Sequence, residues 1–102
     1  MNRKLKKIPP GRAGLMVVAA FRYCLGRMTY IVSDCTEWLV EIWPSLPDNV
    51  KALIERELED AFVRDDEDRA NGTGYKALGH DCDRAAWLTV RVLYRGENET
   101  KE

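Results

Sequence analysis

The chain has 102 residues, of which 45% are hydrophobic and 32% are charged, and its formal net charge is -1. This length predicts a single domain. No stretch approaches the roughly 20 apolar residues of a membrane-spanning helix, so we expect no membrane partner. The three cysteines, Cys24, Cys35 and Cys82, form no C-x-x-C pair. That spacing argues against a disulfide scaffold and favours reduced thiols in a cytoplasmic protein.

The charges are strongly segregated along the chain. Residues 1–27 carry seven basic residues and no acid, whereas residues 28–69 carry twelve acids against four basic residues, a net charge of -8. Such asymmetry bears on binding partners and on electrostatic steering, and says little about the fold.

The first half of the chain predicts a basic arm followed by two helices. Residues 1–10 contain two successive prolines, which bar a helix, so we expect a flexible arm. Residues 12–25 have helical apolar spacing and are apolar nearly all round, so we expect a central, buried helix that ends at Gly26. The spacing in this first helix is set by Leu15, Val18, Ala19, Arg22 and Leu25.

A second helix is predicted over residues 29–43, ended by Pro44. Ile31, Cys35, Trp38, Leu39 and Ile42 form its apolar stripe, and Asp34, Glu37 and Glu41 lie on the opposite side. Trp38 is therefore expected in the core. Trp43, at the helix end, is a candidate anchor for a partner, because tryptophan is enriched at the energetic centres of interfaces. Packing on its own loop is the equal alternative.

The second half predicts two more helices. The third opens near Pro47 and Asp48, with an apolar stripe that includes Val50, Ile54 and Phe62 and an opposite face that includes Glu55, Glu59 and Asp60. Residues 83–94 fit helical spacing and also strand alternation, and their length favours a helix. We predict a mainly α, compact single domain of about four helices over residues 11–96, with the basic arm before it and a polar tail over residues 97–102.

Two short segments are candidates for metal binding. His80-Asp81-Cys82-Asp83 offers H-x-C ligands, but a structural zinc site needs four ligands, usually as two close pairs, and the second pair is missing. The run Asp65-Asp66-Glu67-Asp68 lacks the alternating ligands and central glycine of a calcium loop. We expect a loop histidine beside a helix cap, a solvated helix end, and neither a metal nor a cofactor.

One motif resembles a known group of sequences. The segment R-Y-x-L-G-R-x-T-Y comprises Arg22, Tyr23, Leu25, Gly26, Arg27, Thr29 and Tyr30. It resembles a motif in short uncharacterised proteins of bacterial phages and mobile elements, which carry a helical body and an Asp and a Trp spaced as Asp83 and Trp87 are. The resemblance implies a small accessory protein that binds and redirects host machinery, a class that includes anti-CRISPR inhibitors, and it implies no particular activity.

The leading functional hypothesis is a non-enzymatic protein that acts in the cytoplasm of a host cell. It would bind a basic surface of a nucleic-acid-handling complex, such as a CRISPR effector, and inhibit it; a homodimer is a further possible assembly. The partner-binding residues would be Asp34, Glu37, Glu41, Glu55, Glu59 and Asp60, together with Trp43. One alternative is a nucleic-acid-binding regulator that uses the basic N-terminal segment, against which the pI of about 5.9 argues. Another is a small metal-dependent enzyme around His80.

Overall fold

The computed structural model describes residues 11–26, 30–72 and 74–100. Within these ranges the chain forms four α-helices, one short 3-10 helix and no strand, which confirms the predicted fold class. The helices are α2 (Arg12–Cys24), α3 (Tyr30–Ile42), α4 (Asp48–Ala70) and α5 (Asp81–Thr100), with the 3-10 helix η1 (Trp43–Ser45) after α3. The predicted basic arm, residues 1–10, lies outside the described residues.

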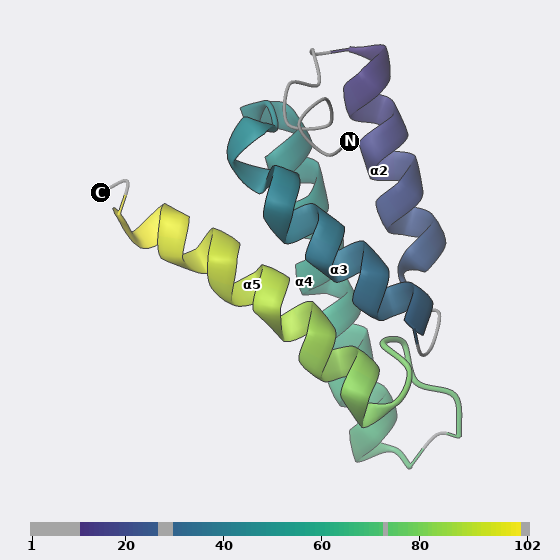
Figure 1. Cartoon of the computed structure of the whole chain (residues 1–102). Helices are drawn as coiled ribbons and strands as arrows, with labels where there is room; N and C mark the ends of the chain where they lie inside the picture. Colours follow the sequence, from purple (N-terminus) through teal and green to yellow (C-terminus); the bar gives the residue numbers. More distant parts are fainter. Residues whose placement is uncertain (1–10, 27–29, 73, 101–102) are drawn as a thin grey trace.

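The four helices enclose one core (Figure 1). Helix α3 lies in front and packs against α2 on one side and against α5 on the other, while α4 lies behind and also contacts α2 and α5. The outer faces of α3 and α4 are therefore on opposite sides of the molecule.

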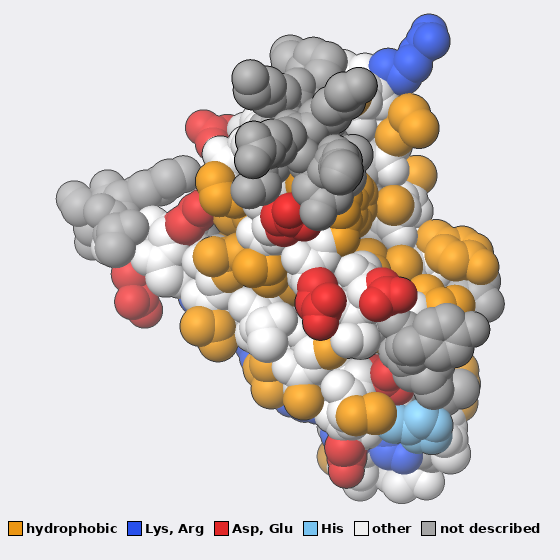
Figure 2. Space-filling model, viewed as in Figure 1, with side chains coloured by type: hydrophobic (Ala, Val, Ile, Leu, Met, Phe, Trp, Pro, Cys, Tyr) orange, Lys and Arg blue, Asp and Glu red, His pale blue; other side chains and the backbone are white. Residues whose placement is uncertain are grey.

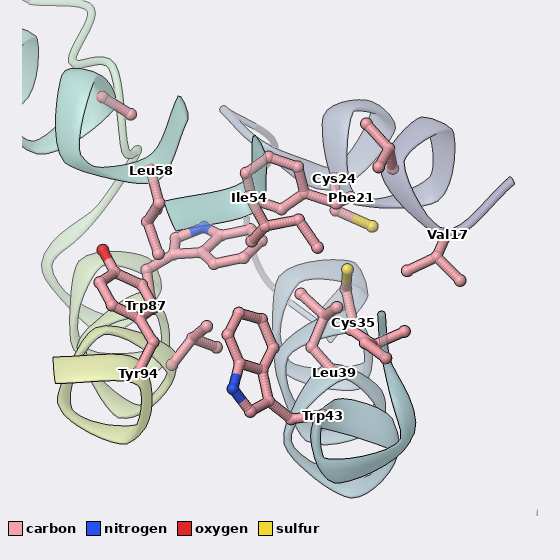
Figure 3. Packing of buried hydrophobic residues seen from close by; sticks show 14 of the residues in the cluster. Val17, Phe21, Cys24, Cys35, Leu39, Trp43, Ile54, Leu58, Trp87 and Tyr94 are labelled. Atoms are coloured by element: carbon pink, nitrogen blue, oxygen red, sulfur yellow. The ribbon is translucent and has the colours of Figure 1, made fainter. Parts of the chain in front are cut away.

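Aromatic residues from three helical segments meet in the centre of this core (Figure 3). Phe21 of α2 meets Trp87 of α5 edge to face, with ring centroids 5.6 Å apart. Trp43 of η1 packs beside Tyr94 of α5 at 6.0 Å. Aliphatic side chains of α3 and α4, among them Leu39, fill the space between the rings. Aromatic side chains bury large areas, so contacts of this kind hold distant parts of the chain together.

Helix α2 is not the central, buried helix that the sequence predicts. Its buried residues are Gly14, Val17, Val18, Phe21 and Cys24, which form one stripe toward α3 and α4. Leu15, which belonged to the predicted apolar spacing, is 66% exposed, and its neighbour Met16 is 67% exposed. The prediction failed because residues 13–20 are apolar on every face, so their composition does not show which face is inside. Gly26 follows the helix with φ of +87°, as its predicted role as a stop requires.

Gly14 lies at a close contact between α2 and α4. A β-carbon at Gly14 would lie 2.8 Å from Cγ2 of Val50. Valine is stiff at χ1 and cannot easily move that methyl group away. Inside a helix, alanine normally stabilises the fold by up to about 1 kcal/mol relative to glycine. At this position the steric overlap between the new β-carbon and the Val50 methyl group outweighs that stabilisation.

We expect Gly14→Ala to lower the free energy of unfolding by about 1 kcal/mol, measured by urea denaturation. In a Val50→Ala background the same change should instead stabilise the protein by up to about 1 kcal/mol, because the methyl group that it strikes is gone. Stabilisation in the wild-type background would show that α2 and α4 are not in close contact at this point.

The last helix is longer than predicted. Residues 83–94 are helical, as their length predicts. The helix starts with a partial capping box, in which Asp83 Oδ2 accepts the backbone N–H of His80 at 2.9 Å. The prediction of a polar tail outside the helical domain is wrong for residues 97–100, because these residues continue α5. Lys51 of α4 donates to Glu97 at 3.2 Å and Asn98 donates to Glu55 at 3.2 Å, so contacts with α4 hold this end of the helix.

Candidate partner-binding surface

The outer side of α3 carries three carboxylates, Asp34, Glu37 and Glu41, which we call the α3 acidic face. Their spacing of three and four residues places them along one side of the helix. Asp34 and Glu37 are exposed and Glu41 is half-buried, and α3 has no lysine or arginine. None of the three makes an ion pair with any residue that the structure describes. Figure 2 shows acidic side chains among hydrophobic ones on this side of the molecule.

A shallow hollow flanks this face on each side. Toward α2, a hollow of about 290 Å³ is lined by Ala20, Tyr23, Cys24, Ile31, Asp34, Cys35 and Trp38. Toward α5, one of about 430 Å³ is lined by Ser33, Thr36, Glu37, Val40, Ala86 and Thr89. One carboxylate of the α3 acidic face borders each hollow. The surface therefore combines unpaired negative charge with apolar concavities, which is the pattern of a protein-binding site with a mixed polar and apolar contact.

The acids expected on the third helix do not join this surface. Glu55, Glu59 and Asp60 belong to α4, behind the core, and the first two face α5. Glu55 accepts a hydrogen bond from Asn98, and Glu59 accepts hydrogen bonds from Arg91, Arg95 and Tyr94. Asp60 is exposed. The six predicted acids therefore fall into two separate groups, and only those of α3 lack internal partners as a group.

Glu59 is the acceptor in the cluster that joins α4 to α5. Arg91 donates to it at 3.1 Å, Arg95 at 2.8 Å and the Tyr94 hydroxyl at 2.6 Å. Burial disfavours the charged carboxylate, but these three donors outweigh burial and lower the pKa of Glu59 to about 2. The Arg91 guanidinium also lies over the Phe62 ring, 4.3 Å from its centroid. Glu59 is thus a structural carboxylate.

The prediction that Trp43 anchors a partner is wrong. Its side chain is fully buried, because the chain turns into η1 after α3 and brings the ring inward against Tyr94. Trp38, predicted in the core, lies instead at its edge and lines the hollow toward α2. The predicted positions of both tryptophans assumed a continuous α-helix to residue 43. The chain instead changes to 3-10 geometry at Trp43, and this change alters the direction of the Trp43 side chain.

The acidic run at the end of α4 is only partly the solvated helix end that the sequence predicts, because Asp66 and Glu67 are exposed but Asp65 and Asp68 are held within the fold. The Asp65 side chain is fully buried and accepts hydrogen bonds from the backbone N–H of Leu78 at 2.9 Å, from Arg69 at 2.6 Å and from Arg84 at 2.5 Å. Burial opposes its ionisation, and these donors nevertheless lower its pKa. Asp68 accepts the N–H of Ala77 at 2.9 Å. The carboxylates of Asp65 and Asp68 thus hold the segment between α4 and α5 against the end of α4 by accepting its backbone N–H groups.

The spacing of Asp65 was the signal that sequence reasoning missed. Asp65 follows Ala61 by four residues and Leu58 by seven, so it lies on the apolar stripe of α4. An acid on such a stripe requires buried donors. Arg69 and Arg84 supply them.

The segment around His80 was the candidate metal site of the alternative enzyme hypothesis. His80 and Cys82 are exposed at the start of α5 and line a hollow of about 700 Å³ with Tyr75, Lys76 and Asp81. No group of three or more potential metal ligands exists in the described ranges.

Of the basic N-terminal residues, Arg22 donates from Nε to Glu57 of α4 at 3.0 Å. Arg22 makes no ion pair with Asp34. Arg12 is exposed at the start of α2, and the remaining five lie outside the described residues. Of the two arginines of this segment that the structure describes, Arg22 is therefore already engaged within the fold.

None of the helices in the described part of the chain is long and apolar enough to cross a membrane. Comparison of the chain with protein-family models, with curated proteins and with solved structures finds no match.

Proposed function

We propose that this protein acts by binding, without catalysis, and that the α3 acidic face contacts a basic surface on another protein. The observation that supports this proposal is the unequal pairing of carboxylates. Most carboxylates in the middle and at the end of α4 have an arginine or amide partner on a neighbouring helix, namely Glu55, Glu57, Glu59, Asp65 and Asp66. Asp34, Glu37 and Glu41 have no such partner among the described residues. Unpaired carboxylates on one helix face repel each other weakly and gain from a cationic partner.

The dimensions of the face fit a surface that ordinarily holds nucleic acid. From Asp34 to Glu41 the helix advances about 10 Å, so three negative charges follow one another at a spacing of a few ångströms. A row of lysines and arginines arranged for phosphates meets such a row of carboxylates with complementary potential. The likeness of the motif around Arg22 to those of phage accessory proteins supports a host nucleic-acid-handling complex, such as a CRISPR effector, as the partner.

The test compares two variants of equal charge change. Asp34→Asn/Glu37→Gln/Glu41→Gln neutralises the α3 acidic face. Asp60→Asn/Glu67→Gln/Glu99→Gln neutralises three exposed acids elsewhere that make no ion pair with described residues. Each tagged protein is incubated with a bacterial host extract, and the recovered nucleic-acid-handling proteins are quantified by mass spectrometry. The first variant should recover the partner at least about tenfold less well, and the control within about twofold of wild type.

Two further results bear on the proposal. Recovery should fall as the salt concentration rises, since the contact is electrostatic. Equal recovery by both variants would overturn the role of the α3 acidic face. In a mobility-shift assay at low salt, random duplex and single-stranded DNA should not be retarded. Tight retardation would instead favour the nucleic-acid-binding regulator that uses the basic N-terminal segment.

A further inference from the structure

Two cysteine thiols meet at the contact between α2 and α3. Cys24 is the last residue of α2, and Cys35 lies in the second turn of α3. Their relative exposures are 8% and 7%. Figure 3 shows both sulfur atoms pointing toward the same space between the helices. Sequence spacing alone did not pair these residues, because they are eleven positions apart on different helices.

The pair is reachable from solvent along one side. Both cysteines line the hollow toward α2, together with Tyr23, Ile31 and Trp38. The third cysteine, Cys82, is exposed at the start of α5 and lines a different hollow. A small reagent therefore has an approach to the pair that does not require the core to open.

We infer that Cys24 and Cys35 form a reversible disulfide by exchange with a low-molecular-weight disulfide of the glutathione type. Cys24 loses its proton and attacks one sulfur of glutathione disulfide, which forms a mixed disulfide and releases one glutathione thiolate. Cys35 then loses its proton and attacks the Cys24 sulfur, which forms the internal disulfide and releases the second glutathione thiolate. The two released thiolates take up the two protons, and the two-electron oxidation of the protein is balanced by reduction of one glutathione disulfide.

The order of attack follows from the surroundings of Cys35. Burial, together with the adjacent Cys24 thiol, raises the pKa of Cys35, so it is a poor first nucleophile. Once Cys24 carries the mixed disulfide, Cys35 is held beside the sulfur that it must attack, and proximity compensates for its low thiolate fraction. The disulfide would join α2 to α3 next to Asp34. This inference does not depend on the proposed function.

The experiment uses the Cys82→Ser variant of the full chain, which removes the exposed thiol. The folded protein is equilibrated in glutathione buffers from reducing to oxidising, quenched with acid, alkylated and digested with trypsin. Cleavage after Arg22 and Arg27 places Cys24 in residues 23–27, apart from Cys35. We expect a cross-linked pair of these peptides at the oxidising end, its loss on reduction, and a melting temperature up to about 10 °C higher for the oxidised form.

Cys24→Ser/Cys82→Ser and Cys35→Ser/Cys82→Ser are the matched controls. Each should retain the fold by circular dichroism and form no internal cross-link, and its melting temperature should not rise on oxidation. Thiols that stay fully alkylatable at the oxidising end would overturn the inference. So would a cross-link that forms only in denaturant, or a cross-linked form that melts below the reduced one, because either result would show that the native fold does not bring the two sulfurs together.

Discussion

Replacing Asp65 with alanine is expected to lower the free energy of unfolding by about 3 kcal/mol, a large share of the roughly 5–15 kcal/mol typical of small domains. The fully buried carboxylate accepts the Leu78 N–H and the guanidinium groups of Arg69 and Arg84. Alanine leaves the Leu78 N–H without its acceptor, and it leaves Arg69 and Arg84 with only their more exposed partners Asp81 and Asp66 among the carboxylates. The two arginine side chains are about a quarter exposed, so water recovers part of the loss, and the lower end of the range for a broken buried pair applies.

Two companion variants separate charge from acceptor geometry. Asp65→Asn keeps an oxygen for the Leu78 N–H and removes the negative charge, so it should cost less than alanine, about 2 kcal/mol. Asp66→Ala removes the neighbouring acid, whose side chain is 64% exposed and pairs with Arg84 at 2.9 Å. It should cost less than about 1 kcal/mol, as exposed ion pairs do. Urea denaturation followed by circular dichroism measures all three. Similar losses for Asp65→Ala and Asp66→Ala would contradict the buried cluster.

The helices themselves follow largely from the sequence, and only residues 83–94 of α5 also fit the alternation of a strand. Val50, Ile54, Leu58, Ala61 and Phe62 repeat with the helical period on α4, and all are buried. The stop at Gly26 also needs only local information, because a residue with positive φ must end that helix. Patterns of this kind depend on neighbours within a few positions, and those neighbours are visible in the sequence.

The parts that failed depend on contacts between distant residues. Glu37 and Glu59 look alike in sequence, since both are acids on the polar side of a predicted helix. Only the packing of α5 against α4 brings Arg91 and Arg95 to Glu59, whereas no described cation reaches Glu37. The burial of Trp43 likewise depends on Tyr94, about fifty residues later in the chain. Local periodicity predicts which residues are polar, but it does not tell which acids have partners.

Glu59 supplies the second large prediction, which concerns pH. Its pKa is about 2 in the folded protein, against an ordinary value of 4.5. The lowered value means that Glu59 stabilises the fold fully above about pH 5 and that this stabilisation disappears as the pH falls from 4.5 to 2. The side chain is 34% exposed, so solvent screening reduces its contribution to about 2 kcal/mol at pH 7.

Glu59→Gln is therefore expected to be about 2 kcal/mol less stable than wild type at pH 7, and the difference between the two proteins should shrink steadily below pH 4.5. Urea denaturation at pH steps from 7 to 2 measures that difference directly, so the titration of other acids cancels. Asp60→Asn changes the next residue, which is exposed and has no ion pair within the described ranges, and should alter stability at pH 7 by less than about 0.5 kcal/mol. A constant difference between wild type and Glu59→Gln across the whole range would show that the carboxylate charge does not join α4 to α5. Glu59 would then be as available to an external partner as the carboxylates of α3.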